Sequence, residues 1–329
     1  MIVVTGAAGF IGSNLIAELE KKGMGQIVAC DSLGHDDKWH NLAKRDLYDF
    51  IAPHRLLTFL EANKNHIDVI YHLGAISNTD ATDGDLVLDN NYCFPLDLFH
   101  WCGRHRVRFI YASSAATYGD GKHGFDDRED YDYLSILRPM NVYGWSKHLF
   151  DRSLLQHVAA REAPTPPQWV GLKFFNVYGP NEYHKGGQSS VVPHFFKQIL
   201  SSKSAYLFKS YKENIPDGHQ ARDFVSVHDA VDVMVWLLNK PEVSGLYNVG
   251  SGVAHTFLDM AHALFKALNE EPQIAFIPMP ERLIKHYQYF TCASMEKLHR
   301  AGYTRSMTSL EEGVYDYIHH YLLKEDPYR

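Results

Sequence analysis

Apolar positions in the first half of the chain fall into two kinds of run. Short β-branched runs predict strands at Ile2–Thr5, Gln26–Asp31, Val69–Leu73, Arg108–Ser113 and Trp169–Phe174. Longer stretches between them, with apolar residues three or four positions apart, predict helices at Ile11–Lys22, Arg55–Asn63, Leu86–Arg106 and Val142–Glu162. This alternation is typical of an α/β fold with a doubly wound parallel sheet, which the strand at Trp169–Phe174 would complete.

The pattern changes beyond Phe175. The sequence becomes richer in Gly, His and Tyr, and Pro193–Ser201 and Asp229–Asn239 stand out as isolated helices. The chain has no low-complexity linker between the two halves. We therefore expect one body with two lobes, the larger over residues 1–175 and the smaller over residues 176–329, part of which returns to the core of the first.

Composition and charge exclude several classes of function. Apolar residues make up 45% of the 329 residues and charged residues 22%, which is enough to bury a core. The net charge of -7 gives no diffuse positive field for nucleic acid or anionic lipid. The longest apolar run, Val233–Leu238, is too short to span a membrane, and the N-terminal residues do not have the pattern of a secretory leader. We expect a cytoplasmic protein with no nucleic-acid or membrane partner.

Cysteine and histidine spacing suggests no metal site. The four cysteines, at positions 30, 93, 102 and 292, show no CxxC spacing, and the 20 histidines show neither HxxxH nor HExxH. We expect reduced thiols and no bound metal.

A glycine pattern follows the first predicted strand and opens the first helix. Gly6, Gly9 and Gly12 lie in TGAAGFIG, where glycine allows a tight turn and a close approach of the backbone to a pyrophosphate. Asp31 ends the second strand, where an acidic side chain binds the ribose hydroxyls of NAD. Lys38 is either a solvated lysine or a partner for the 2′-phosphate of NADP. Residues 1–175 are thus the expected Rossmann domain for NAD(P), and residues 176–329 the expected substrate lobe.

Three further residues form a candidate redox site. Tyr143 and Lys147 are four residues apart in a predicted helix, so both side chains project from one face. A nearby ammonium stabilises a phenolate, which can accept a hydroxyl proton as hydride leaves carbon. Ser114 follows a predicted strand, at the sheet edge where Rossmann ligands bind.

Taken together, TGAAGFIG, YASSAATYG, YGWSK, NVYGP and RDFVSVHDA resemble motifs of the extended short-chain dehydrogenase/reductases that act on nucleotide sugars. DNNY at 89–92, FFNVYGPNEYHKGG at 174–187 and HYQYFT at 286–291 are similar to the ADP-L-glycero-D-manno-heptose 6-epimerases within that group. The resemblance implies a homo-oligomeric epimerase that holds NADP, with NAD as an alternative, acts on ADP-heptose and serves lipopolysaccharide inner-core synthesis.

The resemblance also implies roles for individual residues. Ser114, Tyr143 and Lys147 would form the redox triad, and Lys185 would be a second acid/base. The implied cofactor contacts, besides the three glycines, Tyr143, Lys147 and Lys185, are Phe10, Ile11, Asp31, Ser32, Lys38, Leu73, Gly74, Ala75, Ile76, Ser77, Asn90 and Val177. The implied substrate contacts are Ser114, Asn176, Gly187, His194, Phe208, Lys209, Arg222 and Tyr287.

The chain departs from the family pattern at four places. Lys173 stands where the motif carries arginine, Gly187 replaces a serine, Pro53 replaces a cofactor-binding lysine, and residues 211–220 look like an insertion. Two alternatives remain open: another nucleotide-sugar epimerase or dehydratase, and a non-catalytic NADP-binding sensor. A dehydratase would carry an acidic pair just after the catalytic serine, whereas SSAATYGDG has small residues there.

Overall fold

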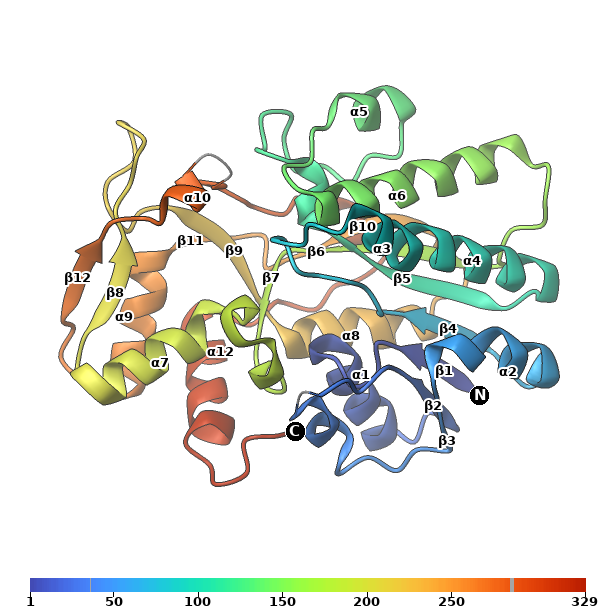
Figure 1. The fold of residues 1–329 in the computed structure, drawn as a ribbon, viewed down its shortest axis with the longest axis horizontal. Coiled ribbons are helices and arrows are strands. Elements are labelled where there is room, and N and C mark those ends of the chain that lie inside the picture. The colour runs from blue at the N-terminus through green and yellow to red at the C-terminus, as the bar shows by residue number, and fades with distance from the viewer. Residues whose placement is uncertain (36, 285–286) are drawn as a thin grey trace.

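A parallel sheet forms the centre of the computed structural model, which describes residues 1–35, 37–284 and 287–329 (Figure 1). Within these residues the sheet has seven strands in the order β10-β6-β5-β4-β1-β2-β3. Their bounds are Ile2–Thr5 for β1, Ile27–Cys30 for β2, Asp49–Ile51 for β3, Val69–His72 for β4, Arg108–Ser114 for β5, Trp169–Phe174 for β6 and Gly245–Val249 for β10. The strand order reverses at β1, between β2 and β4, and such a reversal opens a ligand crevice at the carboxyl ends of the strands.

The doubly wound parallel fold class is confirmed, and so are the five predicted strands, whose ends agree to within one residue. The prediction that Trp169–Phe174 completes the sheet is wrong. β10 pairs with β6 in parallel, with Leu246 opposite Gly171. This strand was missed because its partner lies more than seventy residues earlier in the chain, and β3, of three residues, is too short to show a period.

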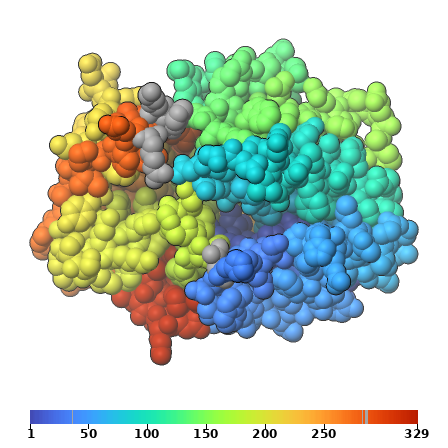
Figure 2. All heavy atoms as spheres, in the orientation of Figure 1, coloured from blue at the N-terminus to red at the C-terminus, as the bar shows by residue number. Residues whose placement is uncertain are grey.

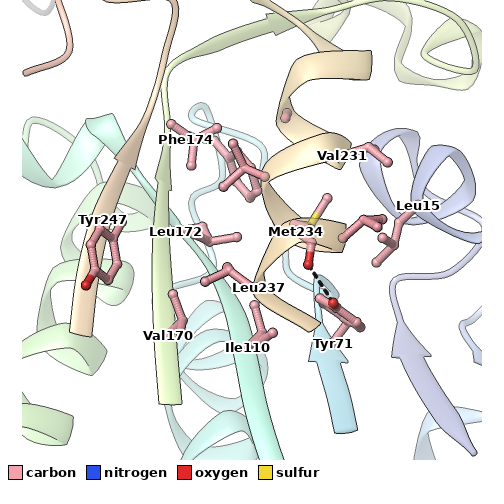
Figure 3. Close-up of a cluster of buried hydrophobic side chains, with 14 of the residues drawn as sticks. Leu15, Tyr71, Ile110, Val170, Leu172, Phe174, Val231, Met234, Leu237 and Tyr247 are labelled. Carbon is pink, nitrogen blue, oxygen red and sulfur yellow. Dashed lines mark hydrogen bonds between the residues drawn. The ribbon is translucent and has the colours of Figure 1, made fainter. Parts of the chain in front are cut away.

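Helices cover both faces of the sheet. Helices α1 (Phe10–Lys21) and α8 (Val227–Leu238) pack on one face, and their apolar side chains share a core with β1, β4, β5 and β6 (Figure 3). In that core the Tyr71 hydroxyl donates to the Met234 carbonyl at 2.7 Å. On the other face lie α2 (Leu56–Asn63), α4 (Phe94–His105) and α6 (Val142–Ala160). The predicted helix at Leu86–Arg106 consists of α3 (Gly84–Leu88), a π-helical turn at Asp89–Cys93 and α4.

Most of the remaining elements pack around a third apolar cluster, drawn in yellow, orange and red in Figure 1. It is built mainly from α7 (Val191–Ser202), α9 (Phe257–Ala267) and α12 (Leu310–Tyr317). The smaller strands are β7 (Asn176–Tyr178), β8 (Ala205–Phe208), β9 (Ala221–Ser226), β11 (Ala254–Thr256) and β12 (Ile274–Ile277), in sheets β11-β9-β7 and β12-β8. Short helices are α5 (Tyr131–Ile136), α10 (Glu281–Ile284) and α11 (Glu296–Arg300).

The division at residue 175 stays a prediction. Two elements from beyond that residue belong to the larger body: β10 is a strand of the sheet, and α8 packs on one face of it. In the described part of the chain, no helix combines the length and the apolarity that a membrane crossing needs.

Candidate active site

The glycine turn between β1 and α1 is closed by backbone contacts that no side chain would allow. Gly6 has φ +64°, and a Cβ there would lie 2.6 Å from the Gly74 amide nitrogen. A Cβ on Gly12 would lie 2.1 Å from the Gly6 carbonyl oxygen. Gly9 precedes the first turn of α1, whose free amides and dipole favour an anion. The turn therefore fits the pyrophosphate of a dinucleotide.

Asp31 and Lys38 form an ion pair beside this turn. The Lys38 ammonium is 2.8 Å from Asp31 Oδ1, and the Ala8 amide donates to Asp31 Oδ2 at 2.9 Å. Both side chains are largely shielded from solvent, with 19% and 10% of their surface exposed. The two groups that the sequence assigned to the adenosine end of the cofactor are therefore brought together.

A cavity of about 490 Å³ opens at the carboxyl ends of β1, β4 and β5. In Figure 2 the molecule is hollowed where the blue N-terminal part meets the teal and yellow-green parts, and dark-blue atoms of the first residues lie at its floor. The cavity brings together most of the predicted site residues: Gly6, Gly9, Phe10, Ile11, Gly12, Asp31, Lys38, Leu73, Gly74, Ala75, Ser77, Ser114, Tyr143, Lys147, Asn176, Val177 and Lys185.

Ser114, Tyr143 and Lys147 meet in this cavity from two elements. Ser114 ends β5 and caps the 3-10 turn Ala115–Tyr118, since its Oγ accepts from the Ala116 amide at 3.1 Å. Tyr143 and Lys147 lie on the first turns of α6, which Asn141 caps by accepting from the Gly144 amide at 2.8 Å. Burial raises the pKa of the Tyr143 hydroxyl, while its hydrogen bond with Ser114 lowers that pKa. The hydroxyls of Ser114 and Tyr143 therefore lie side by side in the cavity.

Lys147 is almost completely buried, with 2% of its surface exposed. Burial lowers the pKa of its ammonium group to about 8, and the Asp151 carboxylate acts in the opposite direction. Because this value lies above neutral, the lysine is mostly cationic at pH 7 and can stabilise a phenolate at Tyr143.

Lys185 reaches the same cavity from the segment Tyr183–Gln188. Its Nζ lies 5.4 Å from the centroid of the Phe10 ring. Burial lowers the pKa of this ammonium, and the buried Glu182 carboxylate raises it. The cavity therefore holds a second lysine, besides Lys147, whose pKa is lowered by burial.

The remaining predicted residues do not line the cavity. Ser32, Gly187 and Asn90 are exposed, and Ile76 is half-buried within the loop after β4. His194 Nε2 lies 3.1 Å from the hydroxyl of Ser189, which does line the cavity. Phe208 and Lys209 end β8, where their carbonyls accept from Gln220.

Arg222 lies between two aromatic rings, 5.1 Å from the Tyr287 centroid and 5.6 Å from that of Phe257, and Phe257 lines the cavity. Its guanidinium donates to the carbonyls of Ala221 and Gln288. His286, the first residue of the HYQYFT motif, lies outside the described residues.

Sequence reasoning missed the residues that hold the site in place. Asn91, rather than its predicted neighbour Asn90, ties the loop after β4 to α6: it accepts from the Ile76 amide at 2.9 Å and donates to the Ser146 hydroxyl at 3.0 Å. Asp151 follows Lys147 by one helical turn and pairs with Lys173 of β6. A lysine in the apolar run WVGLKFF was the available signal, because a buried charge needs a partner.

Comparison with known proteins agrees with this geometry. Residues 2–250 match the model of the NAD dependent epimerase/dehydratase family. The chain is 45% identical to an ADP-L-glycero-D-manno-heptose-6-epimerase of Fusobacterium nucleatum, and 44% identical to one of Nitratidesulfovibrio vulgaris, over 100% of both chains in each case.

Solved structures give the same grouping. The ADP-L-glycero-D-manno-heptose-6-epimerase of Helicobacter pylori has 30% identity and a TM-score of 0.78, covering 97% of this chain and 95% of its own. The UDP-glucose 4-epimerase of Thermus thermophilus, solved with NAD, has 25% identity and a TM-score of 0.74, covering 97% and 98%. This chain is therefore a nicotinamide-dinucleotide-dependent enzyme of the NAD dependent epimerase/dehydratase family, and belongs within it to the ADP-L-glycero-D-manno-heptose-6-epimerases.

Proposed function

We propose that this enzyme interconverts ADP-D-glycero-β-D-manno-heptose and ADP-L-glycero-β-D-manno-heptose by transient oxidation at C6″, for lipopolysaccharide inner-core synthesis. The observation that carries the proposal is the single cavity that holds the glycine turn, the Ser114–Tyr143–Lys147 group and Lys185. The full-length similarity to relatives named for this activity supports the choice of substrate.

The chemistry of the proposed reaction divides between two bases. When bound, the dinucleotide would accept the hydride from C6″ and return it. Ser114 hydrogen-bonds the C6″ oxygen, and Tyr143 takes its proton as a hydride leaves C6″, which gives a ketone. The ketone would then present its other face, and a proton would be delivered to its oxygen as C6″ is reduced. Tyr143 and Lys185 would each serve one orientation.

The nucleotide end of the substrate is assigned to Arg222, Tyr287 and neighbouring residues. Arg222 is the proposed diphosphate clamp, because a guanidinium binds phosphate oxygens in a bidentate manner. Its stacking between Phe257 and Tyr287 supports a fixed orientation. Asn176 lines the cavity, and His194 approaches it through Ser189.

NADP is the cofactor we propose, with Lys38 as the residue that selects it. Lys38→Ala should weaken NADP binding by about 1.5 to 3 kcal/mol, roughly tenfold or more, because a charge-assisted contact to the 2′-phosphate is lost. NAD binding should change less. Titration of the apoprotein with each dinucleotide measures both effects, with Lys22→Ala at the far end of α1 as the control. Equal losses for the two dinucleotides would mean that Lys38 makes no phosphate contact.

Isotope incorporation tests the proposed route. In deuterium oxide, the epimerised product should carry no carbon-bound deuterium at C6″, because the hydrogen goes to the cofactor and returns from it. Abstraction of a proton from C6″ would require an acidic carbon, which the unoxidised sugar lacks. The product is separated and its C6″ position read by NMR. Stoichiometric deuterium at C6″ would contradict the transient ketone and point to carbanion or elimination chemistry.

Resemblance to the family supports two further proposals, that the enzyme is a homo-oligomer and that it works in the cytoplasm. Size measurement in solution tests the first, and cell fractionation tests the second.

A further inference from the structure

A fully buried ion pair lies beside the candidate redox residues, between α6 and β6. Lys173 Nζ is 2.6 Å from Asp151 Oδ2, and both side chains have 0% of their surface exposed. Removing two charges from water costs several kcal/mol per ion, so such a pair is weak evidence for stability alone. Its place in the fold gives the pair a second role.

The pair connects helix α6 to β6, the neighbour of the strand that ends in Ser114. Asp151 lies one turn after Lys147 and two turns after Tyr143, on the same face of α6. Lys173 lies on β6 directly opposite Ser113 of β5. The two charges therefore join α6, which carries Tyr143 and Lys147, to the strand paired with β5.

Hydrogen bonds extend this link to both sides of Ser114. Ser113 Oγ donates to Asp151 Oδ2 at 2.7 Å, just before Ser114 in the chain. Lys173 Nζ donates to Thr117 Oγ1 at 2.8 Å, and Thr117 Oγ1 donates to the Ser114 carbonyl at 2.8 Å. The turn that carries the Ser114 hydroxyl is thus tied to α6 before and after the serine.

Asp151 is also the carboxylate that acts on Lys147. Burial lowers the pKa of Lys147, and the Asp151 charge raises it. Among the groups around them, His72 of β4 stays neutral because burial lowers its pKa to about 3. Burial and the neighbouring Asp151 raise the pKa of the Tyr111 hydroxyl of β5, which donates to Asp151 Oδ1 at 2.8 Å. Burial also raises the pKa of the Tyr143 hydroxyl, and the Asp151 charge acts in the same direction.

We propose that the Asp151–Lys173 ion pair is a positioning device for the redox residues, which fixes the Ser114 turn against α6 and sets the net charge beside Lys147. The inference rests on the roles proposed above for Ser114, Tyr143 and Lys147.

The pH profile of turnover distinguishes this role from a merely structural one. Lys147 is cationic below its pKa, so activity should fall as the pH rises through that value. Asp151→Asn removes the carboxylate, and the alkaline limb should move to lower pH by about one unit. Lys173→Met leaves Asp151 without a neutralising partner, and the limb should move to higher pH. A loss of packing alone would lower turnover in both variants without moving their limbs in opposite directions.

Two further variants complete this set. Lys173→Arg restores the cation and should recover most of the turnover that Lys173→Met loses. Asp229→Asn changes a half-buried carboxylate of α8 that accepts from Thr308, and should leave the alkaline limb in place. Thermal unfolding shows whether each variant folds. If Asp151→Asn does not, the proposal is tested by the shift of the alkaline limb in Lys173→Met alone.

Limbs that coincide with the wild type in the folded variants would overturn the inference. The proposed mechanism is tested separately, because Tyr143→Phe should lose most of its turnover in the same assay. An inactive Tyr143→Phe with unmoved limbs rejects only the ion pair's role, whereas an active Tyr143→Phe rejects the proposed mechanism itself.

Discussion

Replacing Tyr143 by phenylalanine should lower turnover by about a hundredfold to ten-thousandfold, the range typical of a lost general acid/base. The ring keeps its place at the start of α6, and only the hydroxyl and its hydrogen bond with Ser114 are lost. The protein should therefore fold and bind dinucleotide as before. Steady-state epimerisation at saturating substrate, with bound cofactor measured by absorbance, gives both quantities.

Tyr71→Phe is the matched control for that variant. It removes a buried hydroxyl that donates to the Met234 carbonyl in the core between the sheet and α8, and Tyr71 does not line the cavity (Figure 3). The lost hydrogen bond should lower the free energy of unfolding by about 1 kcal/mol and leave turnover unchanged. Wild-type turnover in Tyr143→Phe would remove this tyrosine from the mechanism.

The second large effect is expected at Lys185. Lys185→Ala should retain the cofactor but lose about a hundredfold in epimerisation in at least one direction, because one of the two proton-exchanging groups is gone. Initial rates from each epimer separately measure the two directions. Lys240→Ala, a surface lysine beyond the end of α8, serves as the control. Full rates from both epimers in Lys185→Ala would show that the lysine takes no part in the chemistry.

Much of the sheet and the chemical centre of the site could be predicted from local patterns. The glycine turn, Asp31, Ser114 and the Tyr143–Lys147 pair are each encoded within a few residues of a strand end or on one helix face. The structure brings them into one cavity. For these residues, a short sequence pattern is enough to predict their place at the edge of the sheet or on one face of a helix.

The rest could not be predicted because it depends on contacts between distant segments. β10 joins the sheet through β6, and Asn91 joins the loop after β4 to α6. The ion pair of Asp151 and Lys173 links a helix to a strand. Arg222 and Tyr287 stack on each other although sixty-five positions separate them. No period or short motif carries such information.

The glycine turn has a consequence for redesign of cofactor preference. A side chain at position 6 or 12 would collide with backbone atoms, so neither glycine can be substituted. The turn fits the pyrophosphate, which NAD and NADP have in common. The Asp31–Lys38 pair, by contrast, consists of side chains at the cavity wall. Any library meant to convert this enzyme from one nicotinamide cofactor to the other should therefore vary positions 31 to 38 and leave the TGAAGFIG segment intact.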